Sequence, residues 1–411
     1  MIIAMTKYLK LGIIAALALI LGSCTEADKF DPTREVLVMT GTEASPIVKF
    51  AVENTPAIYP VSVAATGKVE ENHKISLKID NSLVEKYNSE NKTSYFPVPD
   101  GSVQLEKSVV KLSKGTAISE ISNLMIVSDE EFVDGRIYMI PVTITDVDGS
   151  LDVLETSRTI FIRIARLYSF QALNLSNTNM YANYIFEDED MIELGAHTVE
   201  VKFLAHKWHT GTSNLISRML GVYDKNEKGY LYRFGEGGYA VDQLQVLKNH
   251  PTDAEVKFGS TARFQPNTWY TLSITYDGST TRLFVNGVRD SESAGGSGMS
   301  FQRVELGMSW AGYRTSQYFD GRIAELRIWN RALSTSEIQL GLCGVDKAAE
   351  GLMAYWKFDE GQGYIFDDQV GDLDMDWSYV WRCPGESDPL TLQDYSGQVR
   401  WIFDDMNKCA N

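Results

Sequence analysis

Residues 267–288 read NTWYTLSITYDGSTTRLFVNGV, and this stretch decides the fold class of the second half of the chain. Two runs rich in aromatic and β-branched residues, 269–276 and 281–285, flank the dipeptide Asp277-Gly278. The dipeptide Asn286-Gly287 follows the second run. Because Asp-Gly and Asn-Gly beside such runs are strong hairpin signals, the stretch predicts antiparallel strands joined by tight turns.

The same alternation continues on both sides of this hairpin. Residues 198–203 read TVEVKF and residues 322–329 read RIAELRIW, so each predicts a further strand. Turns recur at the spacing expected for a sandwich or a jelly roll. The region therefore predicts an all-β domain.

Three segments of this region resemble the laminin-G-like, concanavalin A-like lectin/glucanase family. They are residues 267–288, the closing segment FDGRIAELRIWNRALSTSEI at 319–338, and HTVEVKF at 197–203. The resemblance implies a concanavalin A-like jelly-roll sandwich over residues 167–345. Phe203 replaces the family's usual tryptophan, and Ala324 replaces a common acidic residue before Glu325. The second departure argues against an inherited metal site.

Residues 346–411 follow this domain, and GLMAYWKFDEGQGYIFDDQVGD at 351–372 resembles the opening strand of another laminin-G-like domain. Too few residues remain for a second such sandwich. We expect a C-terminal β extension packed on the lectin-like domain. A small independent module, supported by a disulfide, is the alternative.

The first half of the chain also predicts an all-β domain. Apolar and polar residues alternate at 75–79 and 160–164, and residues 139–147 and 109–112 predict further short strands. Ser82 and Glu85 form a capping-box pattern before the apolar residues Leu83, Val84 and Tyr87, which predicts one short helix. A Greek-key sandwich with one helix is expected.

Two segments of this half carry a second resemblance. LKIDNSLVEKYNSENKTSYFPVPDGSVQLEKSVVKLSKG at 77–115 and YMIPVTITDVDG at 138–149 are similar to the immunoglobulin-like N-terminal domain, of unknown function, of Bacteroidota surface lipoproteins. The resemblance implies an immunoglobulin-like spacer over residues 35–166, to which no catalytic residue is attributed.

The first 34 residues predict a lipoprotein signal and a tether. Lys7 and Lys10 precede an apolar run at 11–21, and Leu-Gly-Ser-Cys ends at Cys24, a lipobox-like site that predicts removal of residues 1–23 and lipidation of Cys24. Residues 24–34 are polar and predict a flexible leash. Their acidic cluster resembles the surface-export signal of Bacteroidota lipoproteins, which implies an outer-membrane protein facing the exterior.

Charge and cysteine content set further limits. The net charge of −17 predicts that the protein binds neither nucleic acid nor an anionic lipid surface. Besides Cys24, the chain has Cys343, Cys383 and Cys409, which allow one bridge in an oxidising compartment. We expect Cys383 to pair with Cys409, since a short C-terminal segment gains most stability from a cross-link.

All eight tryptophans lie at or beyond position 208, so flat aromatic surfaces are confined to the second half. Sugar rings stack on such surfaces. Trp269, Trp329 and Trp356 lie inside strand patterns and are predicted to be core residues. The candidates for carbohydrate binding are the aromatic residues of turn-rich or alternating stretches: Trp310, Tyr313, Tyr318, Trp208, Trp377 and Trp381.

Acidic residues offer no clear catalytic pair. Residues 187–190 read EDED, and a contiguous run of this kind is typical of a solvated loop, whereas glycosidase carboxylates in this family alternate along one strand. Asp188, Asp190 and Asp320 are weak candidates for a structural calcium ion, and no other cofactor is expected.

These observations favour a non-catalytic surface lipoprotein that captures a polysaccharide or oligosaccharide, as a partner of a glycan-uptake complex. A structural or adhesive protein that binds a protein partner is the first alternative. A concanavalin A-like glycoside hydrolase is the second, because fold alone does not establish activity.

Overall fold

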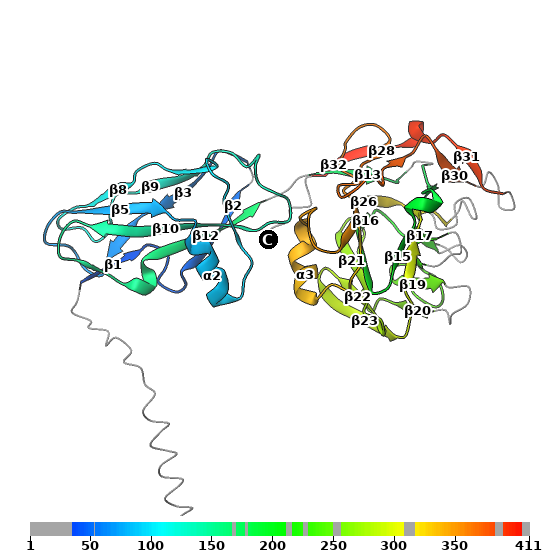
Figure 1. Ribbon diagram of the computed structural model, residues 1–411, viewed down its shortest axis with the longest axis horizontal. Coiled ribbons are helices and arrows are strands. Elements are labelled where there is room, and N and C mark those ends of the chain that lie inside the picture. The colour runs from blue at the N-terminus through cyan, green and yellow to red at the C-terminus, as the bar shows by residue number, and fades with distance from the viewer. Residues whose placement is uncertain are drawn as a thin grey trace, which may run out of the picture.

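The computed structural model describes residues 35–52, 54–166, 170–176, 180–210, 216–224, 229–249, 256–307, 317–382 and 389–404. These residues form two β-sheet domains that lie side by side (Figure 1). The predicted all-β class, with two sandwiches, is confirmed. In the described part of the chain, no helix is both long and apolar enough to cross a membrane.

The first domain is built from one larger sheet and two smaller ones. The larger sheet has the order β2 (Ile47–Val52), β12 (Thr159–Arg166), β10 (Tyr138–Val147), β5 (His73–Ile79) and β8 (Val109–Leu112), with β6 (Phe96–Pro97) on β10. One smaller sheet has the order β11 (Asp152–Val153), β1 (Val36–Met39) and β4 (Val63–Ala65). The other has the order β3 (Ala57–Val61), β9 (Ser122–Ile126) and β7 (Val103–Leu105). Ile75 and Leu77 point into their shared core while Lys74 and Lys78 are exposed, as the alternation predicts.

The predicted helix is α2 (Leu83–Asn91), but the predicted capping box is wrong. The Ser82 hydroxyl donates to Asp80 Oδ1 at 2.6 Å instead of accepting from the helix. Local side-chain partners of this kind compete with caps. The helix ends at Lys92, which has a left-handed backbone (φ 54°). A 3-10 turn, η1 (Glu155–Ser157), precedes β12.

The second domain is a sandwich of two sheets. We call the first the β16 sheet; its order is β23 (Val288–Ala294), β22 (Thr280–Val285), β21 (Trp269–Tyr276), β16 (His197–Ala205), β26 (Gly321–Trp329), β13 (Phe170–Asn174) and β32 (Trp401–Asp404), with β27 (Leu352–Trp356) on β26. We call the second the β17 sheet; its order is β20 (Val256–Gly259), β19 (Leu244–Asn249), β18 (Gly229–Phe234), β17 (Ser217–Tyr223), β25 (Arg303–Leu306), β14 (Ala182–Ile185), β30 (Val380–Arg382) and β31 (Thr391–Gln393).

Short elements connect these strands. β15 (Ile192–Leu194) pairs with β24 (Met299–Phe301), and β28 (Ile365–Phe366) pairs with β29 (Met375–Asp376). The helical segments are η2 (Asp188–Asp190), α3 (Thr335–Leu340), η4 (Gly341–Cys343) and η5 (Ser396–Gln398). Ser334 and Glu337 cap α3 with a complete capping box, which the sequence analysis missed.

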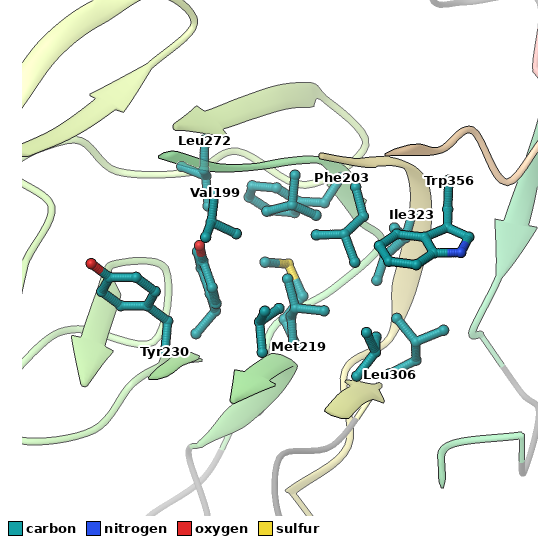
Figure 2. Packing of buried hydrophobic residues seen from close by; sticks show 14 of the residues in the cluster. Val199, Phe203, Met219, Tyr230, Leu272, Leu306, Ile323 and Trp356 are labelled. Atoms are coloured by element: carbon teal, nitrogen blue, oxygen red, sulfur yellow. The ribbon is translucent and has the colours of Figure 1, made fainter. Parts of the chain in front are cut away.

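The core of the second domain lies between its two sheets. Val199, Phe203 and Leu272 from the β16 sheet meet Met219, Tyr230 and Leu306 from the β17 sheet (Figure 2). The strands predicted at 198–203, 269–276, 281–285 and 322–329 are present. Trp329 and Trp356 are buried as predicted, whereas Trp269 is only half-buried.

Residues beyond 345 complete both sheets of this sandwich. β27 and β32 belong to the β16 sheet, and β30 and β31 extend the β17 sheet past β14. Trp356, Phe366, Met375 and Trp377 lie in the same core as Phe203. The C-terminal extension is therefore part of the sandwich and does not form an independent module. Its strands cover the sheet edges that β13 and β14 would otherwise expose.

Cys343 is disulfide-bonded. The sequence analysis expected Cys383 to pair with Cys409, which would leave Cys343 as a free thiol. The disulfide bond of Cys343 contradicts that prediction. Cys24, Cys383 and Cys409 lie outside the described residues.

Ion pairs and a close backbone contact join the two domains. Arg136 Nη2 lies 2.6 Å from Asp346 Oδ2, and Lys357 Nζ lies 3.2 Å from Asp134 Oδ2. Between them Gly135, with φ +77°, packs on Val345 so closely that a Cβ atom would lie 2.4 Å from the Val345 carbonyl carbon. Only glycine fits this position.

Candidate functional site

The outer face of the β17 sheet carries a row of polar side chains. Strand register places Gly221 opposite Glu305, Glu305 opposite Asn183, and Asn183 opposite Trp381, across β17, β25, β14 and β30. Directly paired residues point to the same side of a sheet. Since the flanking residues Val304 and Ala182 lie in the core, this row points away from the core.

A second set of side chains lies beside this row on the same face. Tyr223 and Leu231 pack together in a small cluster separate from the main core. The guanidinium carbon of Arg303 lies 5.1 Å from the centre of the Tyr223 ring. A Cβ atom at Gly221 would lie 2.7 Å from the Tyr223 ring and 3.0 Å from Glu305 Oε2. Glycine therefore leaves the space in which the phenol and the carboxylate meet.

Two buried arginines extend the polar face toward β18 and β19. Arg233 Nη1 lies 2.7 Å from Glu236 Oε2, and Arg218 Nη2 lies 3.8 Å from the same oxygen. Arg233 also donates to Gln245 Oε1 at 3.0 Å, and Arg218 donates to Gln317 Oε1 at 2.7 Å. Buried charges need partners of this kind, and here they fix both guanidinium groups in place.

The electrostatics of the face favour hydrogen bonding over proton transfer. Burial, and next the charge of Glu305, raise the pKa of Tyr223 well above its ordinary value, so the phenol stays protonated and can donate. Asn183 Oδ1 and Arg303 Nε are buried atoms that have no hydrogen-bond partner within the described part of the chain. Other buried atoms without a partner lie elsewhere in both domains, so this feature is not confined to the face.

One predicted aromatic candidate lies at this face, and the backbone of a second lies beside it. Trp381 is half-buried in the polar row, and Asn183 Nδ2 donates to its carbonyl at 3.3 Å. Tyr318 is half-buried and forms a parallel bridge with Arg218, while His209 Nε2 lies 2.9 Å from its carbonyl oxygen. Trp310 and Tyr313 lie outside the described residues.

Trp377 is structural, which corrects the prediction for it. It is buried in the core and its indole Nε1 donates to Met180 O at 2.7 Å. A fully buried ring cannot serve as a sugar platform. Trp208 is half-buried, with its ring 4.5 Å from that of Phe234 and its Nε1 donating to Phe264 O at 3.0 Å, and its role in sugar binding stays a prediction.

The calcium candidates are not brought together. Asp188 accepts from Gln302 Nε2 at 2.7 Å, and Asp320 lies 2.9 Å from Lys207 Nζ. Asp190 is exposed in η2. Among the residues that the structure describes, no group of three or more His, Cys, Asp or Glu side chains is arranged to hold a metal ion.

The sequence analysis missed the most buried members of the face: Asn183, Arg218, Tyr223, Arg233, Glu305. The signal was present, because residues 217–223 and 229–234 read SRMLGVY and GYLYRF, in which an arginine interrupts an apolar strand. A charged residue inside a strand that is otherwise apolar indicates an outward face with a partner network.

Comparison with known families agrees with this geometry. Residues 176–339 match the concanavalin A-like lectin/glucanases superfamily. The chain contains a concanavalin A-like domain. Residues 33–151 match a second family, one of N-terminal domains. No curated protein sequence matches the chain.

Two solved structures that align with the chain differ in the extent of the match. A Bacteroides ovatus ATCC 8483 protein, proposed to bind carbohydrate, is 19% identical and aligns over 90% of this chain and 98% of its own, with a TM-score of 0.60. The heptameric SAP-like pentraxin of Limulus polyphemus is 11% identical over 51% of this chain and 95% of its own, with a TM-score of 0.35. At these identities the B. ovatus structure establishes a shared fold across both domains.

Proposed function

We propose that this protein is a non-catalytic carbohydrate-binding protein whose outer β17-sheet face is the binding surface. The observation that carries the proposal is the row of Glu305, Asn183 and Trp381, which places a half-buried indole beside polar side chains. The apolar face of a pyranose ring stacks on an indole, and sugar hydroxyls pair with polar groups beside it.

The comparisons support the same ligand class. The concanavalin A-like superfamily includes lectins as well as glucanases, and the B. ovatus protein that shares the fold is itself proposed to bind carbohydrate. Because one fold hosts several functions, the proposal depends on the residues of the face.

The test is the affinity of the purified protein for a panel of polysaccharides, before and after Trp381→Ala. We expect the variant to lose about two- to tenfold in affinity, since an aromatic stacking contact contributes about 0.5–1.5 kcal/mol beyond area burial. Phe403→Ala is the matched control, because Phe403 is a 59% exposed aromatic residue on β32 of the other sheet. This control should bind like the wild type.

Four results would contradict the proposal. If no glycan binds, or if Trp381→Ala binds the best glycan unchanged, the face is not a sugar site. Capture of a protein ligand that survives glycosidase treatment would favour the adhesive alternative. Release of reducing sugar by the wild-type protein would establish the hydrolase alternative.

We also propose that the protein is anchored through a lipid on Cys24 at the cell surface, where the first domain holds the binding domain away from the outer membrane. In this position it would deliver glycan to an uptake system. The Cys24→Ala variant should move from the membrane fraction to the soluble fraction without change in glycan affinity. Retention of that variant in the membrane would contradict lipid anchoring.

A further inference from the structure

A cavity of about 700 Å³ lies between the two domains, on the side of the second domain opposite to the β17 sheet. One wall comes from the segment after α2 and from β12 of the first domain. The other wall comes from the outer face of the β16 sheet and from α3, which Figure 1 shows facing the first domain. The volume lies within the range of about 300–1,000 Å³ that is typical of small-ligand sites.

The charged residues that line this cavity in the described part of the chain are all basic. Lys92 and Arg163 come from the first domain, and Lys202 comes from the second. None of the described residues that line the cavity is acidic, although the whole chain carries a net charge of −17. Positive charge on the walls of a cavity in so acidic a protein attracts anions.

Lys202 is fixed in position by the sheet behind it. Its Nζ lies 3.7 Å from Glu325 Oε1, and its side chain is only 7% exposed. Burial lowers the pKa of Lys202, and the charge of Glu325 opposes that effect.

Aromatic rings and amides line the same space. Phe96, 38% exposed, and Tyr95 belong to the first wall, and Trp269 belongs to the second. The indole Nε1 of Trp269 donates to Asp404 Oδ2 at 3.0 Å, which fixes the orientation of its ring. Asn286 and Gln339 add amide groups. Rings on two facing walls, with amides between them, suit the apolar faces and the hydroxyls of sugar rings.

We propose that the interdomain cavity binds a short acidic oligosaccharide, one built from uronic acid units. The rings would stack on the sugars, and Lys92, Arg163 and Lys202 would pair with the carboxylates. This site is separate from the proposed site on the β17 sheet, so each can fail without the other. Since both domains supply its walls, the ligand would also hold the domains together.

The probes are trigalacturonate and triglucuronate, with maltotriose as the neutral sugar and inorganic phosphate as the anion without a sugar. Calorimetric titration of the full protein should show binding of at least one acidic trisaccharide, at least tenfold tighter than either maltotriose or phosphate. Raising the salt concentration should weaken this binding, because part of the affinity is electrostatic.

Two exposed variants, one on each wall, locate the site. Lys92→Asn removes a cation and keeps a residue that tolerates the left-handed backbone at this position. Ser336→Glu adds an acid in the first turn of α3, where a helix accepts negative charge. Their matched controls are Lys86→Asn on the exposed side of α2 and Thr335→Glu, neither of which lines the cavity.

We expect each wall variant to bind the acidic trisaccharide at least fivefold more weakly, with both controls unchanged. Failure of both acidic probes to bind would overturn the proposal. Equal affinity for maltotriose or phosphate would also overturn it, as would unchanged binding by Lys92→Asn and Ser336→Glu. Trp381→Ala should leave this affinity intact, which separates the result from the test of the β17 sheet.

Discussion

At the scale of single residues, a buried ionic network explains how one wall of the interdomain cavity is held. Arg327 pairs with Glu325, lies 3.3 Å from Glu200 Oε2 through Nη1, and donates to Gly341 O at 2.8 Å. Glu200 also accepts from the indole Nε1 of Trp329 at 3.1 Å. Paired buried charges of this kind fix geometry even where they contribute little net stability. The network thereby ties the end of α3 to the β16 sheet.

Glu360 has a partly buried carboxyl group without a basic partner in the interactions described, and it leads to a prediction about how stability depends on pH. Burial, together with the nearby Asp359 and Asp367, raises the pKa of Glu360 to about 7. Oε1 accepts from the Asp367 N–H at 3.0 Å, whereas Oε2 is buried and has no hydrogen-bond partner in the described part of the chain. The folded protein therefore holds a proton that the unfolded chain has released above pH of about 4.5.

Because the native state binds this proton more tightly, the contribution of Glu360 to the free energy of unfolding falls as pH rises from about 4.5 to 7. Glu360→Gln should be more stable than the wild type by about 1–3 kcal/mol at pH 8 and nearly equal to it at pH 4.5. Urea unfolding at the two pH values measures this difference. The exposed Glu90→Gln is the control, and an equal gain at both pH values would argue against a titrating Glu360.

At the scale of elements, the strands were predictable and several of their ends were not. Alternation over 198–203 and 322–329 predicted β16 and β26, because each of those strands buries one face in the sandwich. The helix α2 was predicted but its cap was wrong, since Asp80 attracts the Ser82 hydroxyl. The role of residues beyond 345 was not predictable, because pairing of β32 with β13 joins segments more than two hundred residues apart.

That pairing yields a prediction for a shortened chain. A protein ending at residue 345 lacks Trp356, Phe366 and Trp377 from the core and leaves β13 and β14 as open edges. We expect it to be insoluble or to melt without cooperativity, because burial of one large aromatic side chain alone contributes about 3–5 kcal/mol. Thermal unfolding beside the full chain measures this. A soluble, cooperatively folded short chain would show that the C-terminal strands are dispensable.

At the scale of the whole molecule, the sequence predicted two sandwiches but only part of the candidate site. Trp381 and Tyr318 were identified because aromatic residues are visible in a sequence. Glu305 and Asn183 were not, since register across β14 and β25 brings them together. The interdomain cavity was also beyond prediction, because Lys92 and Lys202 line the same space only once the two domains have packed together.

The most direct test of the central claim is a crystal structure of the protein with the tightest-binding glycan of the panel. The account predicts a sugar ring against Trp381, on the outer face of the β17 sheet. A glycan bound elsewhere, with the outer face of the β17 sheet unoccupied, would contradict it.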